Sequence, residues 1–486
     1  MSPGTDRRFE PGRHDSGRSL MVASRTRRRA SWGRLAVSAI LLSVLRLQPA
    51  TAQVVDGQWS APVQLSRSRG NAGEAAMVAD LFGYVHAVWI QDGMPNSHGF
   101  VAYARFDGNN WSRPFGLDSM KYADSHHRWT TAAVDRHGVL HVIWTSGQSG
   151  PTNYSRVGVG SSISRSKWSS PTRLGLAAYK VKLVVDRKGG LHLLYSQFYD
   201  KSPGVYYVHS TDGGDEWSRP IQLDPAIPAG YAPYFIHLAV DEADELHAIW
   251  HYYLPEKTRG RSIHYRHSAD SGTTWAPPVT LAEPGESDDE LKMANPVLGV
   301  TGREVHVIWA GGRPPSTCRY ERISTDAGVT WQAAHRVFGD LHGQAISDGL
   351  ATDGSGRIHF IGQLRWPQGL YEATYANGVW STPSLFYLIA HDAKDPIGER
   401  IHAHRINAVV RAGNQLVTTF TTLGANDTVL YAMHRTMDDA DQLPALPIPL
   451  PPPPDRGWPI WVLGGVCVVV AGGVVLWALA GPGART

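Results

Sequence analysis

The chain has 486 residues, among them 50 Gly, 32 Pro, 17 Trp and 19 Tyr. This composition, spread over short alternating runs, indicates an all-β protein and excludes a mainly helical one. The formal net charge of +3 is small for the length and comes from Arg near the N-terminus, so no basic stripe for nucleic acid is expected. The two cysteines, Cys318 and Cys467, lie in unlike segments, and we expect no structural disulfide.

Residues 1–52 are predicted to be a signal peptide with a long basic lead. A run of arginines between 25 and 34 precedes an apolar stretch at 35–45, and Ala50-Thr51-Ala52 offers a small-x-small cleavage site ahead of Gln53. We therefore expect the mature protein to be exported.

Two sequence motifs alternate through residues 53–440. The first is a Trp-Ser-x-Pro tail or a variant of it, roughly every 50 to 60 residues. The second is an Asp followed six residues later by a His in a strand-like run. Each motif is found seven times if copies that lack some of its residues are counted. The tails begin at Trp59, Trp111, Trp168, Trp217, Trp275, Trp331 and Trp380, and the second motif carries His86, His141, His192, His247, His306 and His359.

Each repeat is predicted to contain four strands, which the fourth repeat shows at 235–241, 246–252, 262–268 and 275–281. Four-stranded antiparallel units around a ring form a β-propeller. We expect seven blades. The chain begins with a fourth strand at 59–65 and ends with first to third strands at 407–410, 415–420 and 428–435, so the N-terminal strand is predicted to close the last blade.

The C-terminal region is predicted to anchor the protein in a membrane. A Pro-rich linker at 441–457 precedes an uncharged apolar segment at 458–480, which is long enough for a transmembrane helix, and 481–486 form a short tail. Trp458, Trp461 and Trp477 are placed as interfacial anchors. A cleavable sorting signal is the alternative. With the signal peptide, this segment predicts a single-pass protein whose propeller lies outside the cytoplasm.

The repeated Asp and His residues are interpreted as structural, because a catalytic centre needs one unique set of groups. The spacing of Asp and His across a short hairpin predicts that the two side chains hydrogen-bond. No metal site and no cofactor are expected.

A more specific pattern, S-x-D-x-G-x-x-W, is found at 210–217, 268–275 and 324–331. It resembles the Asp-box, or BNR, repeat of the sialidase superfamily. That resemblance implies hydrolysis of terminal sialic acid by a Tyr nucleophile paired with a Glu, with an Asp as acid/base and three Arg on the carboxylate. Tyr252 and Glu256 are the candidates for the nucleophile pair, and Arg128, Arg313, Arg365 and Arg405 for the arginines.

Two departures weaken the transfer of sialidase activity: the sequence has no Arg-Ile-Pro motif before the first blade, and it has seven repeats where sialidases have six. The strand pattern G-x-[IL]-H is also similar to that of some seven-bladed polysaccharide lyases. If the protein is such a lyase, His127 is a catalytic candidate together with Tyr199 or Tyr252, and Arg128 or Arg313 neutralises the carboxylate of a uronate.

The loops that enter each first strand, and those between second and third strands, should lie on one face and carry the unique residues. Aromatic and planar polar groups there suit a sugar, and arginines suit its carboxylate. We therefore expect carbohydrate binding on this face, with or without catalysis, and a protein-interaction role as the other alternative. The predicted ligand-binding residues are His126, Arg128, Tyr199, Tyr231, Tyr234, His251, Arg313, Arg365, His404 and Arg405.

Overall fold

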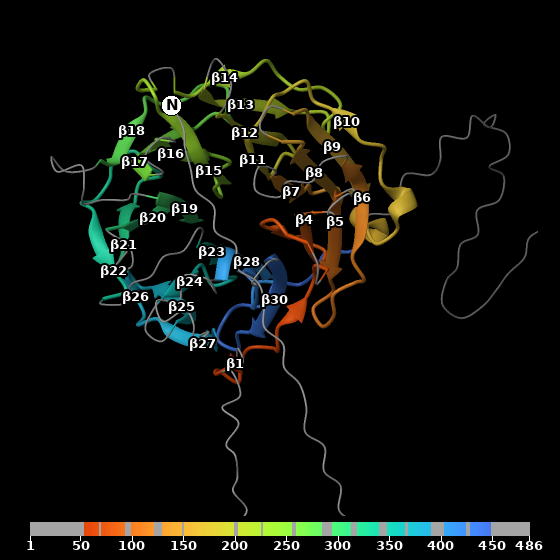
Figure 1. The fold of residues 1–486 in the computed structure, drawn as a ribbon. Coiled ribbons are helices and arrows are strands. Elements are labelled where there is room, and N and C mark those ends of the chain that lie inside the picture. Colours follow the sequence, from red (N-terminus) through yellow and green to blue (C-terminus); the bar gives the residue numbers. More distant parts are fainter. Residues whose placement is uncertain are drawn as a thin grey trace, which may run out of the picture. The chain divides into compact units, whose positions relative to one another are not determined.

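The computed structural model describes residues 53–67, 70–92, 99–120, 129–147, 150–198, 203–224, 227–254, 259–283, 294–312, 318–339, 348–364, 368–389, 403–423 and 428–448. In this part of the chain seven antiparallel sheets form a ring (Figure 1). The first strand of each sheet lies nearest the centre, as β11, β15, β19 and β23 show in the figure. The fold is a seven-bladed β-propeller, as the repeat count predicted: six blades have four strands each and one has six.

Blades 1 to 4 follow one another along the chain, each with its strands in sequence order from the centre outward. Blade 2 also carries two short 3₁₀ helices, η2 (Val159–Ser161) and η3 (Arg165–Lys167), between its third and fourth strands. The strands are β3 (Ala76–Ala79), β4 (Val85–Gln91), β5 (Gly99–Phe106) and β6 (Phe115–Met120) in blade 1; β7 (Thr130–Val134), β8 (Val139–Thr145), β9 (Thr152–Gly158) and β10 (Thr172–Arg173) in blade 2; β11 (Lys180–Val185), β12 (Leu191–Gln197), β13 (Gly204–Ser210) and β14 (Ile221–Gln222) in blade 3; and β15 (Ala232–Val240), β16 (Leu246–Leu254), β17 (Arg259–Ser268) and β18 (Val279–Ala282) in blade 4.

Blades 5 to 7 complete the ring, and the last two take in strands from the N-terminus. Their strands are β19 (Ala294–Thr301), β20 (Glu304–Gly311), β21 (Cys318–Ser324) and β22 (His335–Val337) in blade 5; β23 (Gly349–Thr352), β24 (Ile358–Leu364), β25 (Gly369–Ala376), β26 (Val379–Trp380), β27 (Ser384–Leu388) and β1 (Gln53–Val54) in blade 6; and β28 (Ala403–Arg411), β29 (Gln415–Leu423), β30 (Thr428–Thr436) and β2 (Val63–Gln64) in blade 7.

The N-terminal segment closes the ring, as predicted, and does so at two blades. β2 pairs with β30 as the outermost strand of blade 7, with Val63 opposite Ala432. β1, which the sequence did not predict, pairs with β27 at the edge of blade 6, with Gln53 opposite Leu388. Between the two strands the indole of Trp59 is buried and stacks on Phe386 at 4.1 Å. One short segment therefore joins the two ends of the ring.

The Asp–His spacing produces the predicted hydrogen bond in blades 1, 2, 3 and 6. In blade 3 the His192 Nε2 lies 3.1 Å from Asp186, and its Nδ1 lies 2.6 Å from the Tyr207 hydroxyl on the neighbouring strand. The same arrangement, with the hydroxyl between 2.7 and 2.8 Å from the histidine, recurs at His86–Tyr103, His141–Tyr154 and His247–Tyr265. We call this Asp–His–Tyr set the flank relay. All its members are buried between blades.

The flank relay reaches the next blade at the S-x-D-x-G-x-x-W turns. In the turn at 268–275 the Gly272 N–H donates to Ser268 Oγ at 2.8 Å, and the Thr274 N–H donates to Asp270 Oδ1 at 2.8 Å. The Tyr207 hydroxyl of blade 3 lies 3.4 Å from the Ser271 carbonyl of this turn, and the Tyr207 ring packs on Trp275. The turn therefore docks one blade on another.

The turn glycines are required by this docking. Gly272 has a φ of +86°, and a Cβ added to it would overlap the Tyr207 hydroxyl. Gly214 and Gly328 have the same positive φ and meet the tyrosines of blades 2 and 4 in the same way. Only glycine both adopts this backbone conformation without strain and leaves room for the ring.

In blades 5 and 6 a glutamate replaces the tyrosine of the relay. In blade 5 Glu321 replaces the tyrosine and lies 2.8 Å from His306 Nδ1, and it accepts a 2.8 Å bond from the Trp380 indole of blade 6. In blade 6 Glu372 lies beside His359 and accepts a bond from Arg435 of blade 7. A tyrosine hydroxyl faces a carbonyl, whereas a carboxylate faces an N–H donor, so each third-strand residue matches the group that its neighbour presents.

No helix among the described residues is long and apolar enough to cross a membrane. The predicted signal peptide at 1–52 and the predicted span at 458–480 lie outside those residues, and export and anchoring remain predictions.

Candidate functional site: the mouth of the axial channel

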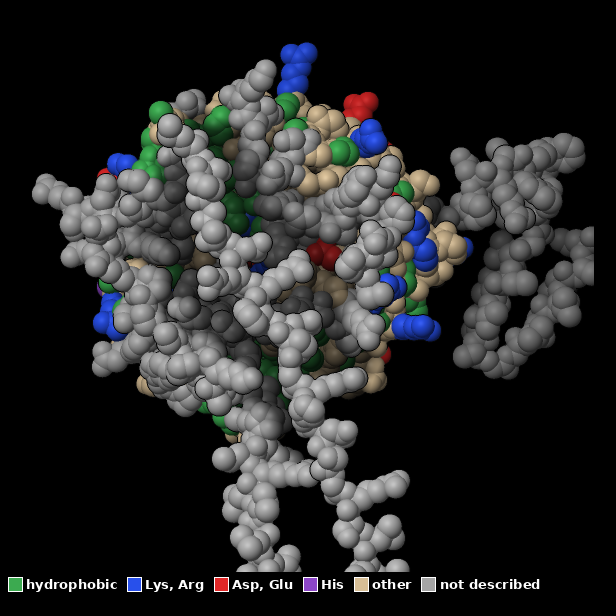
Figure 2. All heavy atoms as spheres, viewed as in Figure 1, with side chains coloured by type: hydrophobic (Ala, Val, Ile, Leu, Met, Phe, Trp, Pro, Cys, Tyr) green, Lys and Arg blue, Asp and Glu red, His purple; other side chains and the backbone are tan. Residues whose placement is uncertain are grey.

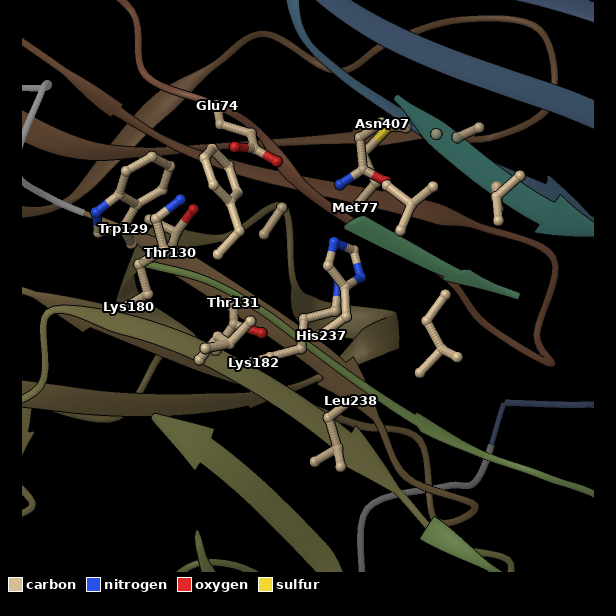
Figure 3. A pocket seen from close by; sticks show the side chains of 18 of the residues that line it. Glu74, Met77, Trp129, Thr130, Thr131, Lys180, Lys182, His237, Leu238 and Asn407 are labelled. Carbon is tan, nitrogen blue, oxygen red and sulfur yellow. The ribbon is translucent and has the colours of Figure 1, made fainter. Parts of the chain in front are cut away.

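A cavity of about 220 Å³ opens where the first strands begin (Figure 3). Every blade contributes lining residues from its first strand or from just before it: Glu74, Ala76 and Met77, then 129–132, 180–182, 235–238, 297–298, 348–350 and 406–409. Because all seven first strands start at the same face, the cavity lies on the axis of the ring. This is the face on which the sequence predicted the ligand site.

Lys180 at the start of β11 is the best-defined group of the cavity. Its side chain is 5% exposed, and its ammonium nitrogen lies 3.5 Å from the ring centre of Trp129 and 3.4 Å from that of Phe235. Contacts of this kind stabilise a cation, more so away from water. Burial nevertheless lowers the pKa of Lys180 well below its usual range, and Glu74 opposes that shift. Among the described residues, Lys180 forms no ion pair.

Lys182 lies two residues further along β11, on the same face of the strand as Lys180. His237 of β15 points into the cavity near it (Figure 3). Both side chains are partly exposed. Burial lowers the pKa of Lys182, and burial with the two lysines nearby lowers the pKa of His237 well below its usual value. His237 is therefore neutral at neutral pH.

Arg405 of β28 lies close enough to Lys180 and Glu74 to interact with both electrostatically. Its backbone has a φ of +56°, and its Nη1 donates to the Ala72 carbonyl of blade 1 at 3.4 Å. Asn407, two residues on, donates from Nδ2 to the Ala75 carbonyl at 3.1 Å and lines the cavity. Blade 7 thus places a guanidinium and an amide beside the blade 1 end of the site.

Negative charge is scarce around this cavity. Of the carboxylates that line it, Asp348 is taken up by Arg319, which donates to it at 2.5 and 3.1 Å. Glu74 is the other one, and it faces Lys180, Lys182 and Arg405. When both lysines are protonated the described part of the site therefore has more positive than negative charge. Figure 2 shows acidic and basic side chains at the centre of the ring.

Aromatic side chains continue from the cavity along the same face. Tyr234 stacks on Tyr253 at 4.9 Å and lies 5.8 Å from Tyr179, and Phe198 packs against all three. Tyr234 also approaches the Lys180 ammonium at 4.8 Å. Flat apolar surfaces next to a cation suit a sugar ring that carries an acidic group.

Only some of the predicted site residues lie at the cavity. Tyr234 and Arg405 lie at the cavity or beside it. Tyr231 accepts a 2.9 Å bond from Arg261 on the outer part of blade 4. His251 is buried, its Nδ1 accepts a 3.3 Å bond from the Asn295 N–H, and burial with Lys180 nearby lowers its pKa to about 3.

Tyr252 is not among the residues that line the cavity. It is 3% exposed, it packs in the core between blades 3 and 4, and its hydroxyl donates to Asp224, which also accepts from the Trp250 indole. Seven other predicted residues lie outside the described residues: His126, His127, Arg128, Tyr199, Glu256, Arg313 and Arg365. For His404 only the backbone, in β28, is described.

Sequence reasoning missed Glu74, Lys180, Lys182 and His237. A signal was present: Lys180-Val181-Lys182 places two charges on one face of a strand that should be innermost, and His237 is a further polar residue in such a strand.

The described residues contain no group of three or more His, Cys, Asp or Glu arranged to hold a metal ion.

No family model and no curated protein matches this sequence. Solved structures do match its fold. An ulvan lyase, a polysaccharide lyase of family PL25 solved bound to -[GlcA(1-4)Rha3S]-, aligns with a TM-score of 0.51 and 11% identity over 76% of this chain and 97% of its own.

Two other alignments have TM-scores below 0.5. An α-L-arabinanase of Penicillium chrysogenum has a TM-score of 0.44 and 14% identity, over 80% of this chain and 100% of its own. The NanB sialidase of Streptococcus pneumoniae has a TM-score of 0.42 and 12% identity, over 81% and 71%. At 11% identity the alignment with the ulvan lyase shows a shared fold alone.

Proposed function

We propose that this protein is an exported, membrane-anchored propeller of the Asp-box type that binds an acidic carbohydrate at the mouth of its axial channel. The observation that carries the proposal is Lys180, a buried ammonium held between Trp129 and Phe235 with no described ion-pair partner. Burying an uncompensated charge destabilises a fold, so such a charge in a cavity is a candidate for function.

A carboxylate or sulfate on a sugar complements this arrangement. The anion would pair with Lys180 and Arg405, while the sugar ring would lie on the aromatic faces that begin at Tyr234. The fold supports the same class of ligand only by analogy, through the ulvan lyase whose bound saccharide contains glucuronate.

Binding is favoured over sialidase-type hydrolysis by the position of Tyr252. The hydroxyl of this candidate nucleophile donates to Asp224 in the core between two blades, away from the cavity. The lyase alternative depends on His127 and Tyr199, which lie outside the described residues, and no described contact favours it.

The proposal is tested with the full chain, purified in detergent, on an array of acidic glycans and their neutral counterparts. We expect retention of uronate-bearing or sulfated glycans only. Lys180→Met should weaken binding at least about tenfold while leaving the protein folded, because it removes the charge and keeps an apolar side chain between the rings.

Lys188→Met is the matched control, because Lys188 lies exposed in the β11–β12 turn, and it should bind like the parent. Equal retention of neutral glycans, or full binding by Lys180→Met, would contradict the proposal.

A further inference from the structure

The axial cavity contains two sets of basic groups at different depths. Lys180 lies at the start of β11 with the aromatic rings and Arg405, and Lys182 lies two residues further into the channel with His237. Residues i and i+2 of a strand are about 7 Å apart. Contacts with Trp129 and Phe235 hold the Lys180 ammonium at one place in the cavity, while Lys182 and His237 lie together at another. Two acidic groups on one sugar or on adjacent sugars can therefore each meet one lysine.

We infer that Lys182 and His237 form an inner anion subsite, so that the cavity takes a saccharide with two acidic groups, one on Lys180 and one on Lys182. The inference rests on the proposed function, and it names the class of ligand that the site prefers. A ligand with one acidic group leaves the charge of the other lysine uncompensated.

The surroundings of His237 support a role in this subsite. The charged groups that reach it are Lys180 and Lys182 from β11, while Glu74 lies among the residues that line the same cavity ahead of β3. Asp348, which also lines the cavity, is already paired with Arg319. Burial lowers the pKa of His237 and so favours its neutral form, and the two lysines add to this effect.

An anion bound beside Lys182 would reverse this balance. The negative charge favours the imidazolium form, so His237 would take up a proton as the second acidic group binds. Affinity for a doubly acidic ligand would then rise as the pH falls toward the pKa of His237 in the empty cavity, whereas affinity for a ligand with one acidic group would change less.

The experiment uses two chondroitin disaccharides that differ by one group: the unsulfated form, which has one carboxylate, and the 4-sulfated form. Calorimetry with the full chain should show the sulfated form binding at least about tenfold more tightly. Lys182→Gln should abolish this preference while keeping the affinity for the unsulfated form. Lys180→Gln should weaken both, and Lys188→Gln should change neither.

Proton uptake is measured by repeating the titration in buffers of equal pH and different ionisation enthalpy. The parent should take up protons with the sulfated disaccharide, and His237→Gln should take up fewer. This readout separates a charged subsite from a structural role, because a variant that merely loosens the fold would weaken both ligands equally.

Equal affinity of the parent for the two disaccharides, or a preference that survives Lys182→Gln, would overturn the inference while the proposed function stands. If neither disaccharide binds, inorganic sulfate is the remaining probe. Sulfate binding that Lys182→Gln removes would support the inner subsite and contradict carbohydrate recognition. Absence of sulfate binding as well would refute both.

Discussion

The flanks of the blades and the mouth of the axial channel use buried polar groups in opposite ways. On the flanks each relay histidine has a polar side chain within 3.5 Å of both ring nitrogens. His192, for example, lies between Asp186 and Tyr207. At the mouth Lys180 is buried on aromatic rings and forms no ion pair with a described residue, although Glu74 lies near enough to interact with it electrostatically. The flank groups recur from blade to blade, whereas those of the mouth are found once.

This difference separates stability from function. A buried polar network that is fully paired contributes to a unique fold, while an unpaired buried charge costs stability and persists where a ligand supplies its partner. Repetition is therefore the mark of the structural groups in this protein, and departure from repetition marks the candidate site.

The largest effect is expected where the ring is closed. Deletion of residues 53–65 removes β1, β2 and the buried Trp59, and exposes the edges of blades 6 and 7. We expect loss of the cooperative unfolding transition or a fall in its midpoint by more than about 10 °C, because blades 6 and 7 each lose an edge strand. Circular dichroism on heating measures this. A truncated chain that melts like the parent would show that the ring is held elsewhere.

The docking of the flanks is tested at a turn glycine. Gly328→Ala should destabilise by about 2 to 4 kcal/mol, because the residue has a positive φ and its new Cβ would overlap the Tyr265 hydroxyl of blade 4. Gly302→Ala is the matched control: its φ is also positive, and nothing lies within 4 Å of an added Cβ. It should cost about 1 kcal/mol. Urea unfolding midpoints measure the stability of the two variants. Equal losses of stability would mean that the contact between blades adds nothing beyond backbone strain.

A smaller effect is expected from acid. The pKa of His251 falls to about 3 in the folded protein, whereas the unfolded chain has the ordinary value near 6.5. Below pH 6.5 the unfolded state therefore binds a proton that the folded state does not, and stability falls with pH by at most about 2 kcal/mol at pH 5 from this residue. The lowered pKa values of His86 and His192 act in the same direction.

His359 should oppose this trend. It lies between Asp353 and Glu372, and these carboxylates raise its pKa against the effect of burial, so it contributes stability below its unfolded pKa that is lost as the pH rises through the folded value. Urea midpoints at pH 7.5 and 5.0 test the balance. His251→Gln should reduce the loss at pH 5, and a parent that is equally stable at both pH values would contradict the assignment.

The local parts of this fold could be predicted from residue order. Blade number, strand order and the Asp–His bond depend on neighbours close in sequence, and His192 lies only six residues after Asp186. The closing strand was predicted from the permutation of the repeats. The contact of Tyr154 with the Gly213 carbonyl was not, because the two residues are 59 positions apart and meet only when blades stack.

The candidate site depended on the tertiary structure for the same reason. Residue order determined the repeats, and it placed the unique residues on one face. It did not show that Lys180 would lie between Trp129 and Phe235, since those rings come from the blades on either side of its own. Closing the ring brings seven strand ends to one axis, and the charge of the cavity is a property of that convergence rather than of any single repeat.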